Sequence, residues 1–571
     1  MNAFRIRRIV RRALRPALLA GIAVLLFLPL RGLIAPPSAG PVVPGLFQAV
    51  PNGPGHPKIQ SVLTHLAAIE RFQGREAAGL YANRRKIDLS DGSVRVVSVV
   101  QSPGHVRSMT QAAAFICGRI ESLGGRVETT YRGLVQHTIP LSALEILADD
   151  PLIKYIRAPL KPFKQTVVSE GVALTGADLW KSIAPFKNAV QAKICILDAG
   201  FDGYSSKLGK ELPATVTARS FRADGDITGG GEIHGTACSE IAYDMAPDAK
   251  FYLVNFETDV EQHNAVDWIV AQKMDVISCS LCWFNAGAGD GTGPIDDDPA
   301  YAASHGIAWA NSAGNSAQDH WFGPFVDTDG NGYMNFPNGA ELLTFNVEAN
   351  DTVGVFLNWK DWGAYDGTDY AGSDQDYDLE LYINNGANWQ YVDSSTNPQT
   401  GSQWPTEEIY GWYSTVKATW GLKIKRVSAS AAKAAINLEV VVMGDYPSID
   451  FYNRNRSVLV PADSPDVLTA GATRVGNDVV EYFSSRGPTW DGRLKPDLTA
   501  PDGVSTATYG DHNFYGTSAA APHLAGAIAL LKGKTPYTIA QIKTLLIKRA
   551  IDLGAAGPDN DYGYGRLNLK K

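Results

Sequence analysis

The sequence predicts an α/β protein in which a parallel sheet flanked by helices is interrupted by an all-β sandwich and preceded by a small α+β unit. From residue 193 onward, short apolar runs alternate with helical segments, which is typical of a parallel sheet covered on both faces. Seven of the twelve tryptophans fall between residues 317 and 460, where Asp, Asn and Gly are frequent and several stretches alternate like antiparallel strands. A length of 571 residues also exceeds one ordinary domain.

Residues 1–40 have the pattern of an export signal. Arginines crowd the first 15 residues, an apolar run follows over 17–30, and small residues occur at 36–39. The run is shorter than the roughly 20 residues of a membrane-spanning helix. We therefore expect a cleavable signal peptide and a secreted or cell-envelope protein. The alternative is a retained N-terminal anchor, and a membrane is a partner only in that case.

The segments that follow differ in amino-acid composition and hydrophobic pattern, which predicts the domain boundaries. Residues 41–79 are expected to be a linker and the start of a proregion, because 36–57 is rich in Pro and Gly. Residues 80–165 form the α+β unit, with a strand at 94–100 and a helix at 108–123. The α/β domain comes in two pieces, 171–316 and 461–571, on either side of the sandwich at 317–460. Its expected strands are 193–197, 251–255, 276–280 and 307–310, and its expected helices are 236–244, 260–273, 299–305, 518–532 and 539–549.

Charge and cysteine content exclude two classes of protein. Seven arginines precede the first acidic residue, Glu70, so the rest of the chain is more acidic than the net charge of -8 states. Without a basic stripe, nucleic acid is not expected as a partner. Five cysteines do not make a disulfide framework, and the CxxC spacing of Cys279 and Cys282 has no second pair, so buried thiols are expected.

Three side chains stand at element boundaries in the order Asp, His, Ser. Asp198 follows an expected strand, His234 opens a helical segment, and Ser518 opens another. Each alone is more often a turn former or a helix cap. Together, and each within two residues of a glycine, they match one of the chain orders known for serine nucleophiles.

The stretches that carry these residues resemble the subtilisin-like serine peptidases, the subtilase family. They are Ile196-Leu-Asp198-Ala-Gly200, His234-Gly-Thr236-Ala, Ser312-Ala-Gly-Asn315 and Gly516-Thr-Ser518-Ala-Ala-Ala-Pro522-His523-Leu-Ala-Gly526. The resemblance covers about 260 residues, roughly 171–316 and 461–571. It implies a subtilisin-like parallel sheet.

The resemblance also assigns roles. Asp198 orients His234, His234 takes the proton of Ser518, and Ser518 attacks a peptide carbonyl to give an acyl-enzyme. Asn315 is implied as the side-chain donor to the oxyanion, beside the backbone N–H of Ser518. No cofactor is needed for this chemistry.

Two positions depart from the family pattern. Ala199 stands where the family usually has Ser or Thr after the catalytic Asp. The substrate-binding residues implied by the resemblance are Ser280, Leu281, Cys282, Trp283, Ala313 and Gly314, and here Cys282 and Trp283 replace two common glycines. We expect altered selectivity at the subsite they line.

Residues 80–165 are similar to the inhibitory prodomain that often precedes subtilases. We expect this unit to block the site until the chain is cut between 159 and 176. The alternative is a stable extra domain.

A calcium loop is the other expected site. Asp327, Asp329, Asn331 and Tyr333 place oxygen ligands at alternating positions, with Gly332 where such a loop turns. The twelfth position is Asn338 instead of a bidentate Glu, so a solvated turn is the alternative. Asp374, Asp376 and Asp378 form a second acidic cluster. Calcium, if bound, is structural.

The function expected is an exported serine endopeptidase, made as a self-processing zymogen, that acts on proteins or peptides and has its own prodomain as inhibitor. Two alternatives stay open. One is a non-catalytic adhesion or binding protein on a peptidase scaffold. The other is a transpeptidase that passes the same acyl-enzyme to an amine.

Overall fold

The computed structural model describes residues 56–85, 87–101, 108–161, 163–164, 171–182, 192–428, 436–444, 448–533 and 535–570. The expected signal segment, 1–40, lies outside the described residues. Residues 41–571 form one compact unit. No helix in the described ranges is long and apolar enough to cross a membrane.

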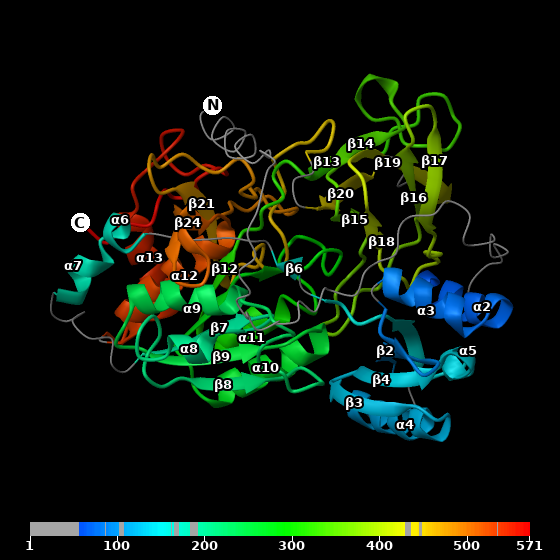
Figure 1. Ribbon diagram of the computed structural model, residues 1–571, viewed down its shortest axis with the longest axis horizontal. Coiled ribbons are helices and arrows are strands. Elements are labelled where there is room, and N and C mark those ends of the chain that lie inside the picture. The colour runs from blue at the N-terminus through cyan, green and yellow to red at the C-terminus, as the bar shows by residue number, and fades with distance from the viewer. Residues whose placement is uncertain are drawn as a thin grey trace, which may run out of the picture. The chain divides into compact units, whose positions relative to one another are not determined.

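The central sheet has seven parallel strands (Figure 1). In spatial order they are β22 (Leu498–Asp502), β21 (Val467–Arg474), β12 (Ala308–Ser312), β10 (Val276–Cys279), β7 (Lys193–Asp198), β9 (Lys250–Asn255) and β8 (Thr217–Ser220). Because all run the same way, their carboxyl ends share one edge, where sites collect in such folds.

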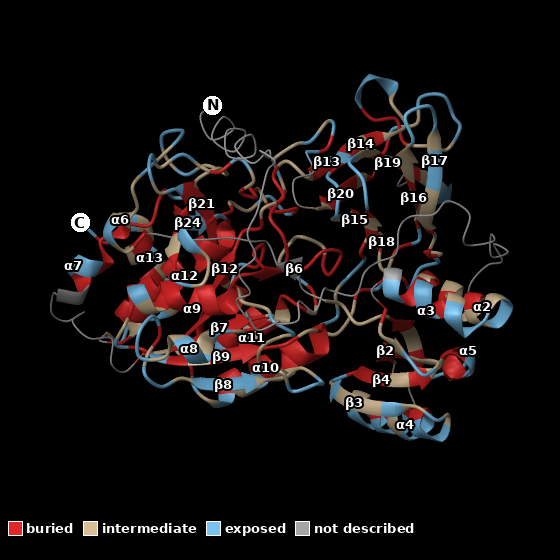
Figure 2. Ribbon diagram, in the orientation of Figure 1, coloured by how far each residue is buried: buried red, intermediate tan, exposed pale blue. Residues whose placement is uncertain are grey.

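Helices cover both faces of this sheet. In Figure 2 the sheet and the helices beside it are largely coloured as buried. On one face α9 (His234–Met245), α12 (Thr517–Lys532) and α13 (Ile539–Arg549) pack with Ile194 and Ile196 of β7. On the other face α10 (Asp259–Ala271) and α11 (Asp297–Ser304) pack with Cys195 and Leu197. Alternate residues of one strand thus enter two cores, and the predicted α/β fold is confirmed.

The N-terminal α+β unit has a five-stranded antiparallel sheet. Its elements are α2 (Ser61–Gln73), α3 (Arg75–Arg84), β1 (Leu89–Ser90), β2 (Ser93–Val100), α4 (Met109–Ser122), β3 (Arg126–Tyr131), β4 (Leu134–Pro140), α5 (Leu144–Ala148) and β5 (Ile153–Arg157). Helices α2 and α3 extend it beyond the predicted start at residue 80. Leu63, Leu66 and Ile69 lie on one face of α2 and enter the same core as the sheet, so packing joins them to this unit.

The β insert consists of two four-stranded antiparallel sheets around one core. One contains β13 (His320–Pro324), β20 (Asn437–Met443), β15 (Asp351–Trp359) and β18 (Thr406–Ser414), and the other contains β14 (Leu343–Val347), β19 (Ala418–Ser428), β16 (Asp376–Asn384) and β17 (Trp389–Ser395). Trp359 and Trp420 are fully buried in that core. The tryptophan-rich texture therefore reflects packing more than an exposed binding stripe.

Short elements complete the chain. They are β6 (Phe163–Lys164), α6 (Val172–Thr175), α7 (Ala177–Ser182), α8 (Tyr204–Lys207), β11 (Leu281–Cys282), β23 (Val504–Thr506) and β24 (Gly510–Phe514).

Candidate active site

The three predicted catalytic residues lie near the carboxyl edge of the parallel sheet. Asp198 is the last residue of β7, His234 is the first of α9, and Ser518 is the second of α12. The side chains are almost completely buried, with exposures of 0%, 0% and 1%.

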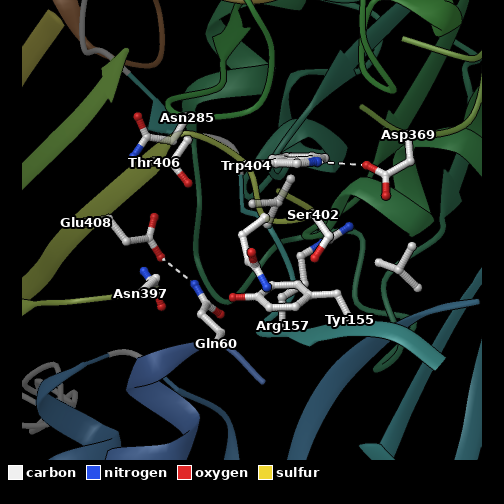
Figure 3. A pocket seen from close by; sticks show the side chains of 13 residues that line it. Gln60, Tyr155, Arg157, Asn285, Asp369, Asn397, Ser402, Trp404, Thr406 and Glu408 are labelled. Carbon is white, nitrogen blue, oxygen red and sulfur yellow. Dashed lines mark hydrogen bonds between the residues drawn. The ribbon is translucent and has the colours of Figure 1, made fainter. Parts of the chain in front are cut away.

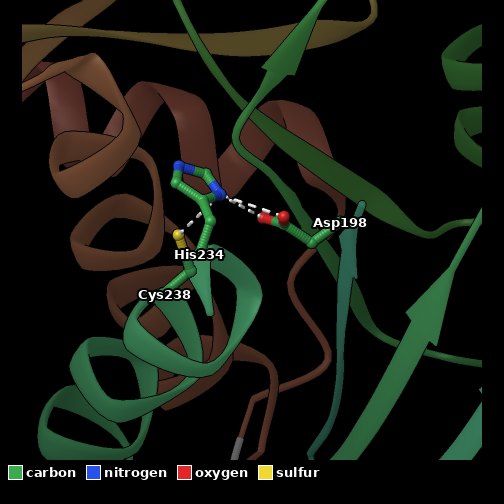
Figure 4. Close-up of side chains that lie close together, drawn as sticks. All are labelled: Asp198, His234 and Cys238. Carbon is green, nitrogen blue, oxygen red and sulfur yellow. Dashed lines mark hydrogen bonds and ion pairs between the residues drawn. The ribbon is translucent and has the colours of Figure 1, made fainter. Parts of the chain in front are cut away.

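Asp198 and His234 form a close pair (Figure 4). His234 Nδ1 lies 2.9 Å from both carboxylate oxygens, and the backbone N–H of Ala199 donates to Asp198 Oδ1 at 2.8 Å. Burial opposes protonation of the ring, but the Asp198 carboxylate outweighs it and raises the pKa of His234 well above 6.5. With Nδ1 held this way, Nε2 is the nitrogen that can accept a proton.

Close backbone approach at Gly235 brings His234 to the carboxylate. A Cβ at position 235 would lie 2.6 Å from the Gly200 carbonyl oxygen and 2.8 Å from Asp198 Cβ. No larger residue fits there without moving the strand end away from the helix. This explains why the catalytic pair occurs in glycine-containing motifs.

Ser518 is held by neighbouring backbone groups. Its Oγ donates to the carbonyl oxygen of Ser280 at 3.2 Å, and its own carbonyl accepts from Ser280 Oγ at 3.0 Å. His234 Nε2 has no hydrogen-bond partner among the described residues. The structure thus shows the hydroxyl turned toward Ser280, as in many resting sites whose catalytic hydrogen bond tightens only with substrate.

Cys238 is a neighbour that sequence reasoning did not assign to the site. It follows His234 by one helical turn, and its Sγ lies 4.0 Å from His234 Nδ1 and 3.6 Å from the Ser518 carbonyl oxygen. The four-residue spacing was the available signal. Burial raises the pKa of this thiol, so it stays protonated at neutral pH.

Thr517 orients Asn315. The Asn315 Oδ1 atom accepts from the backbone N–H of Thr517 at 2.9 Å and from Thr517 Oγ1 at 2.8 Å. Thr517 Oγ1 also accepts from the N–H of Gly314 at 3.1 Å. Because both bonds use the amide oxygen, the Nδ2 group is left as the donor, which is the geometry that the predicted oxyanion role requires.

The predicted substrate strand already carries a paired segment. β11 pairs antiparallel with β6, with Leu281 opposite Lys164 and Cys282 opposite Phe163. Main-chain pairing along one strand edge is how extended peptides dock on proteins. The segment just after the N-terminal unit therefore occupies the edge of the strand that is predicted to bind substrate.

The side chains at the unusual subsite positions point into packed regions. Trp283 stacks on Phe256 with ring centroids 6.2 Å apart and donates to Gln262 Oε1 at 3.3 Å, so it belongs to the core beneath α10. Cys282 lies in an apolar cluster with Leu459 and residues of the insert. Leu459 is a neighbour that sequence reasoning missed: its Cδ1 lies 2.9 Å from the Cβ position of Gly314, while Leu459 N–H donates to Ala313.

The N-terminal unit contacts the α/β domain through α10. Arg95 Nη2 lies 2.8 Å from Glu261 Oε1, and the Arg157 guanidinium pairs with Asp259. Both acceptors stand in the first turn of α10 and are nearly fully buried. Removal of one partner of such a buried ion pair strongly destabilises the folded state, because the other charge stays buried without compensation.

The same unit also binds the insert. Arg85 pairs with Asp393 at 2.7 Å, and the Ser61 N–H donates to Asn397 Oδ1 at 2.7 Å. A cavity of about 60 Å³ lies in this region. Figure 3 shows side chains that line it, among them Arg157 of the N-terminal unit and Glu408 of the insert. None of the three predicted catalytic residues lines this cavity, so it is distinct from the candidate active site.

The predicted calcium turn uses its oxygens internally. Asp327 accepts from the N–H groups of Gly330 at 2.8 Å and Gly332 at 3.1 Å, and Asn331 Oδ1 accepts from Tyr333 N–H at 2.8 Å. Asp329 accepts from Asn331. In the part of the chain that the structure describes, the one group of three His, Cys, Asp or Glu side chains with ligand atoms within 4.8 Å of each other is Asp198, His234 and Cys238.

Comparison with known proteins gives consistent matches. The model of the subtilase family matches residues 190–565. The chain is 23% identical over 452 residues to the minor extracellular protease Vpr of Bacillus subtilis (strain 168), which covers 72% of this chain and 51% of Vpr. It is 25% identical over 260 residues to pyrolysin of Pyrococcus furiosus, covering 41% of this chain and 17% of pyrolysin. The chain thus spans about half or less of these relatives.

The similarity of this chain to solved structures is weaker. The CspB protease of Clostridium perfringens has a TM-score of 0.46 at 16% identity, with 69% of this chain and 95% of that chain covered. Fervidolysin from Fervidobacterium pennivorans has a TM-score of 0.39 at 15% identity, with 84% and 61% covered.

Proposed function

The chain belongs to the subtilase family, and on that premise we propose that it is an exported serine endopeptidase, made as a zymogen, that hydrolyses peptide bonds with Asp198, His234 and Ser518. The observation that carries the proposal is the buried pair in which both oxygens of Asp198 hold His234 Nδ1 and leave Nε2 as the base. Its position beside the start of α12, which carries Ser518, completes the set of groups that acyl transfer needs.

The proposed reaction begins when Ser518 Oγ turns from the Ser280 carbonyl to His234 Nε2. The oxygen attacks the peptide carbonyl carbon while its proton passes to Nε2, and Asp198 stabilises the imidazolium. The carbonyl oxygen becomes an oxyanion between Asn315 Nδ2 and the backbone N–H of Ser518. His234 then gives the proton to the leaving amine, and water releases the acyl group by the same steps in reverse.

Two observations support the zymogen part of the proposal. β6 lies on the substrate strand β11, and the N-terminal unit is held by buried ion pairs on α10. Cleavage between residues 159 and 176 would break the covalent link between the N-terminal unit and the α/β domain, so that β6 could leave β11 and a substrate could take its place. Export is supported by the extracellular relatives, Vpr among them. Calcium at the Asp327 turn stays a prediction.

A fluorophosphonate probe tests the proposal directly. Such probes react with an activated serine, so secreted wild type is expected to be labelled and shortened, whereas Ser518→Ala is expected to be unlabelled and full-length. N-terminal sequencing of the shortened chain locates the cut. A folded, shortened wild type without label contradicts the assignment of Ser518, and label on a chain whose N-terminal unit is still covalently attached contradicts the zymogen part.

A further inference from the structure

The loop that follows the substrate strand is tied to a segment before β21. Gly291 N–H donates to Asp463 Oδ2 at 2.8 Å, and Arg493 bridges the two segments by donating to the carbonyl oxygens of Asp290 and Asp463, both at 2.6 Å. At its far end the loop reaches Asp296, the residue before α11. Two aspartates from distant parts of the chain are thereby brought together under a glycine-rich loop.

Their carboxylates are buried, and three of the four carboxylate oxygens have no hydrogen-bond partner among the described residues. Asp296 is 2% exposed and neither of its oxygens has a hydrogen-bond partner among the described residues; Asp463 is 1% exposed and its Oδ1 is equally unpartnered. Burial, with the charges of Asp463 and Asp290 adding to it, raises the pKa of Asp296 well above its usual range. Burial likewise raises the pKa of Asp463 to about 6.

Two nearby cations only partly offset the effect of burial. The charge of Arg493 acts against the raised pKa of both carboxylates and that of Lys495 against the raised pKa of Asp463, but Lys495 pairs with Asp497. The Arg493 guanidinium gives its N–H groups to Asp491 at 2.6 Å and to the two carbonyls, and no described ion pair joins it to Asp296 or Asp463. A carboxylate withdrawn from water without a partner is costly, so such groups are protonated or bind a cation.

Two oxygens of the loop lie around Gly287. A Cβ at Gly287 would lie 3.5 Å from Asp296 Oδ2, 3.3 Å from the carbonyl oxygen of Thr292 and 3.4 Å from Val460 Cγ2, so the carboxylate and the carbonyl lie on the same side of the loop. The Tyr370 hydroxyl donates to the same Thr292 carbonyl and fixes its direction. Carboxylate and carbonyl oxygens in an irregular loop are the ligands that Ca²⁺ prefers.

We propose that Asp296, Asp463 and the carbonyl of Thr292 bind one divalent hard cation, with Ca²⁺ as the best fit. The site differs from the Asp327 turn, where backbone N–H groups already occupy the carboxylate. The cation would fasten the loop after β11 to the segment before β21, and so would stiffen the base of the substrate strand. The proposal does not depend on the peptidase activity.

Thermal unfolding of the full-length Ser518→Ala chain tests the site without self-cleavage. After chelation at pH 8, where Asp463 is ionised, millimolar CaCl₂ is expected to raise Tm by at least about 3 °C, with MgCl₂ less effective. Asp296→Asn and Asp463→Asn, each in the same background, are expected to lose this rise. Because each removes buried charge repulsion, their Tm in chelator is expected to equal or exceed that of the parent.

The matched control is Asp511→Asn on the exposed strand β24, outside both predicted calcium sites, which is expected to keep the rise. Calorimetric titration adds a second readout: the number of Ca²⁺ bound is expected to fall by one in Asp296→Asn and in Asp463→Asn. The proposal is overturned if Ca²⁺ raises the Tm of Asp296→Asn or Asp463→Asn as much as that of the parent, or if neither cation changes the parent's Tm. Should one variant fail to fold, the other and the parent's stoichiometry still decide.

Discussion

His234 and His263 each pair with a buried carboxylate in two different regions of the molecule. Each ring places Nδ1 2.9 Å from a buried carboxylate, Asp198 for His234 and Asp298 for His263. Neither Nε2 has a hydrogen-bond partner in the described ranges. In both, burial opposes protonation, and the neighbouring carboxylate outweighs it and raises the pKa of the ring.

The surroundings separate the two pairs. His234 lies near the carboxyl edge of the parallel sheet, close to the start of α12. His263 lies on α10, its partner Asp298 comes from α11, and its ring stacks on Tyr131 of the N-terminal unit with centroids 4.5 Å apart. A histidine and a carboxylate thus provide a base only where a nucleophile and an oxyanion donor meet them; elsewhere the same pair holds elements together.

The strongest test of this difference exchanges each carboxylate for its amide. Asp198→Asn is expected to lower kcat about 10⁴-fold, because Asn supports the wrong tautomer of His234 and cannot stabilise the imidazolium. Asp298→Asn is expected to leave kcat within about threefold, since it touches no reacting atom. Both variants, matured by trace wild type and then purified away from it, are compared by kcat on a chromogenic peptide. Equal losses would refute the distinction between the pairs.

Removal of the oxyanion donor gives the next largest effect. Asn315→Ala is expected to lower kcat by about 10²–10³, with KM little changed, because the donor acts mainly on the transition state. Thr517→Val removes the hydroxyl that orients Asn315 Oδ1 but keeps the Thr517 backbone N–H bond, so a smaller loss of about tenfold is expected. A larger loss in Thr517→Val than in Asn315→Ala would show that Thr517 does more than orient the amide.

Local patterns in the sequence predict the fold and the catalytic centre for a clear reason. Asp198 and Ser518 stand at a strand end and a helix start, and both the boundaries and the adjoining glycines are visible along the chain. The roles of Asp296 and Asp463 depend on contact across 167 positions of sequence, which no local spacing encodes. The orientation of Trp283 could not be predicted from the sequence for a similar reason, because Phe256 and Gln262, which lie on other elements, fix it.

The smallest predicted effect is a pH dependence that has opposite signs for activity and for stability. The base must be neutral, so kcat/KM is expected to rise with pH and to reach its midpoint above about 6.5, because the Asp198 carboxylate raises the pKa of His234. Asp198→Asn is expected to move that midpoint to lower pH. Asp298→Asn is expected to leave it in place.

Stability is expected to change in the other direction. A histidine whose pKa is raised by folding stabilises the folded state fully below the unfolded pKa of about 6.5, and this contribution is lost as pH rises through the folded pKa. Tm should therefore decline above pH 6.5, and Asp298→Asn should make the decline shallower without abolishing it, since the pair of His234 contributes with the same sign. An activity midpoint that shifts in Asp298→Asn would mean that His263 is coupled to the catalytic base, and the two regions would then be one system.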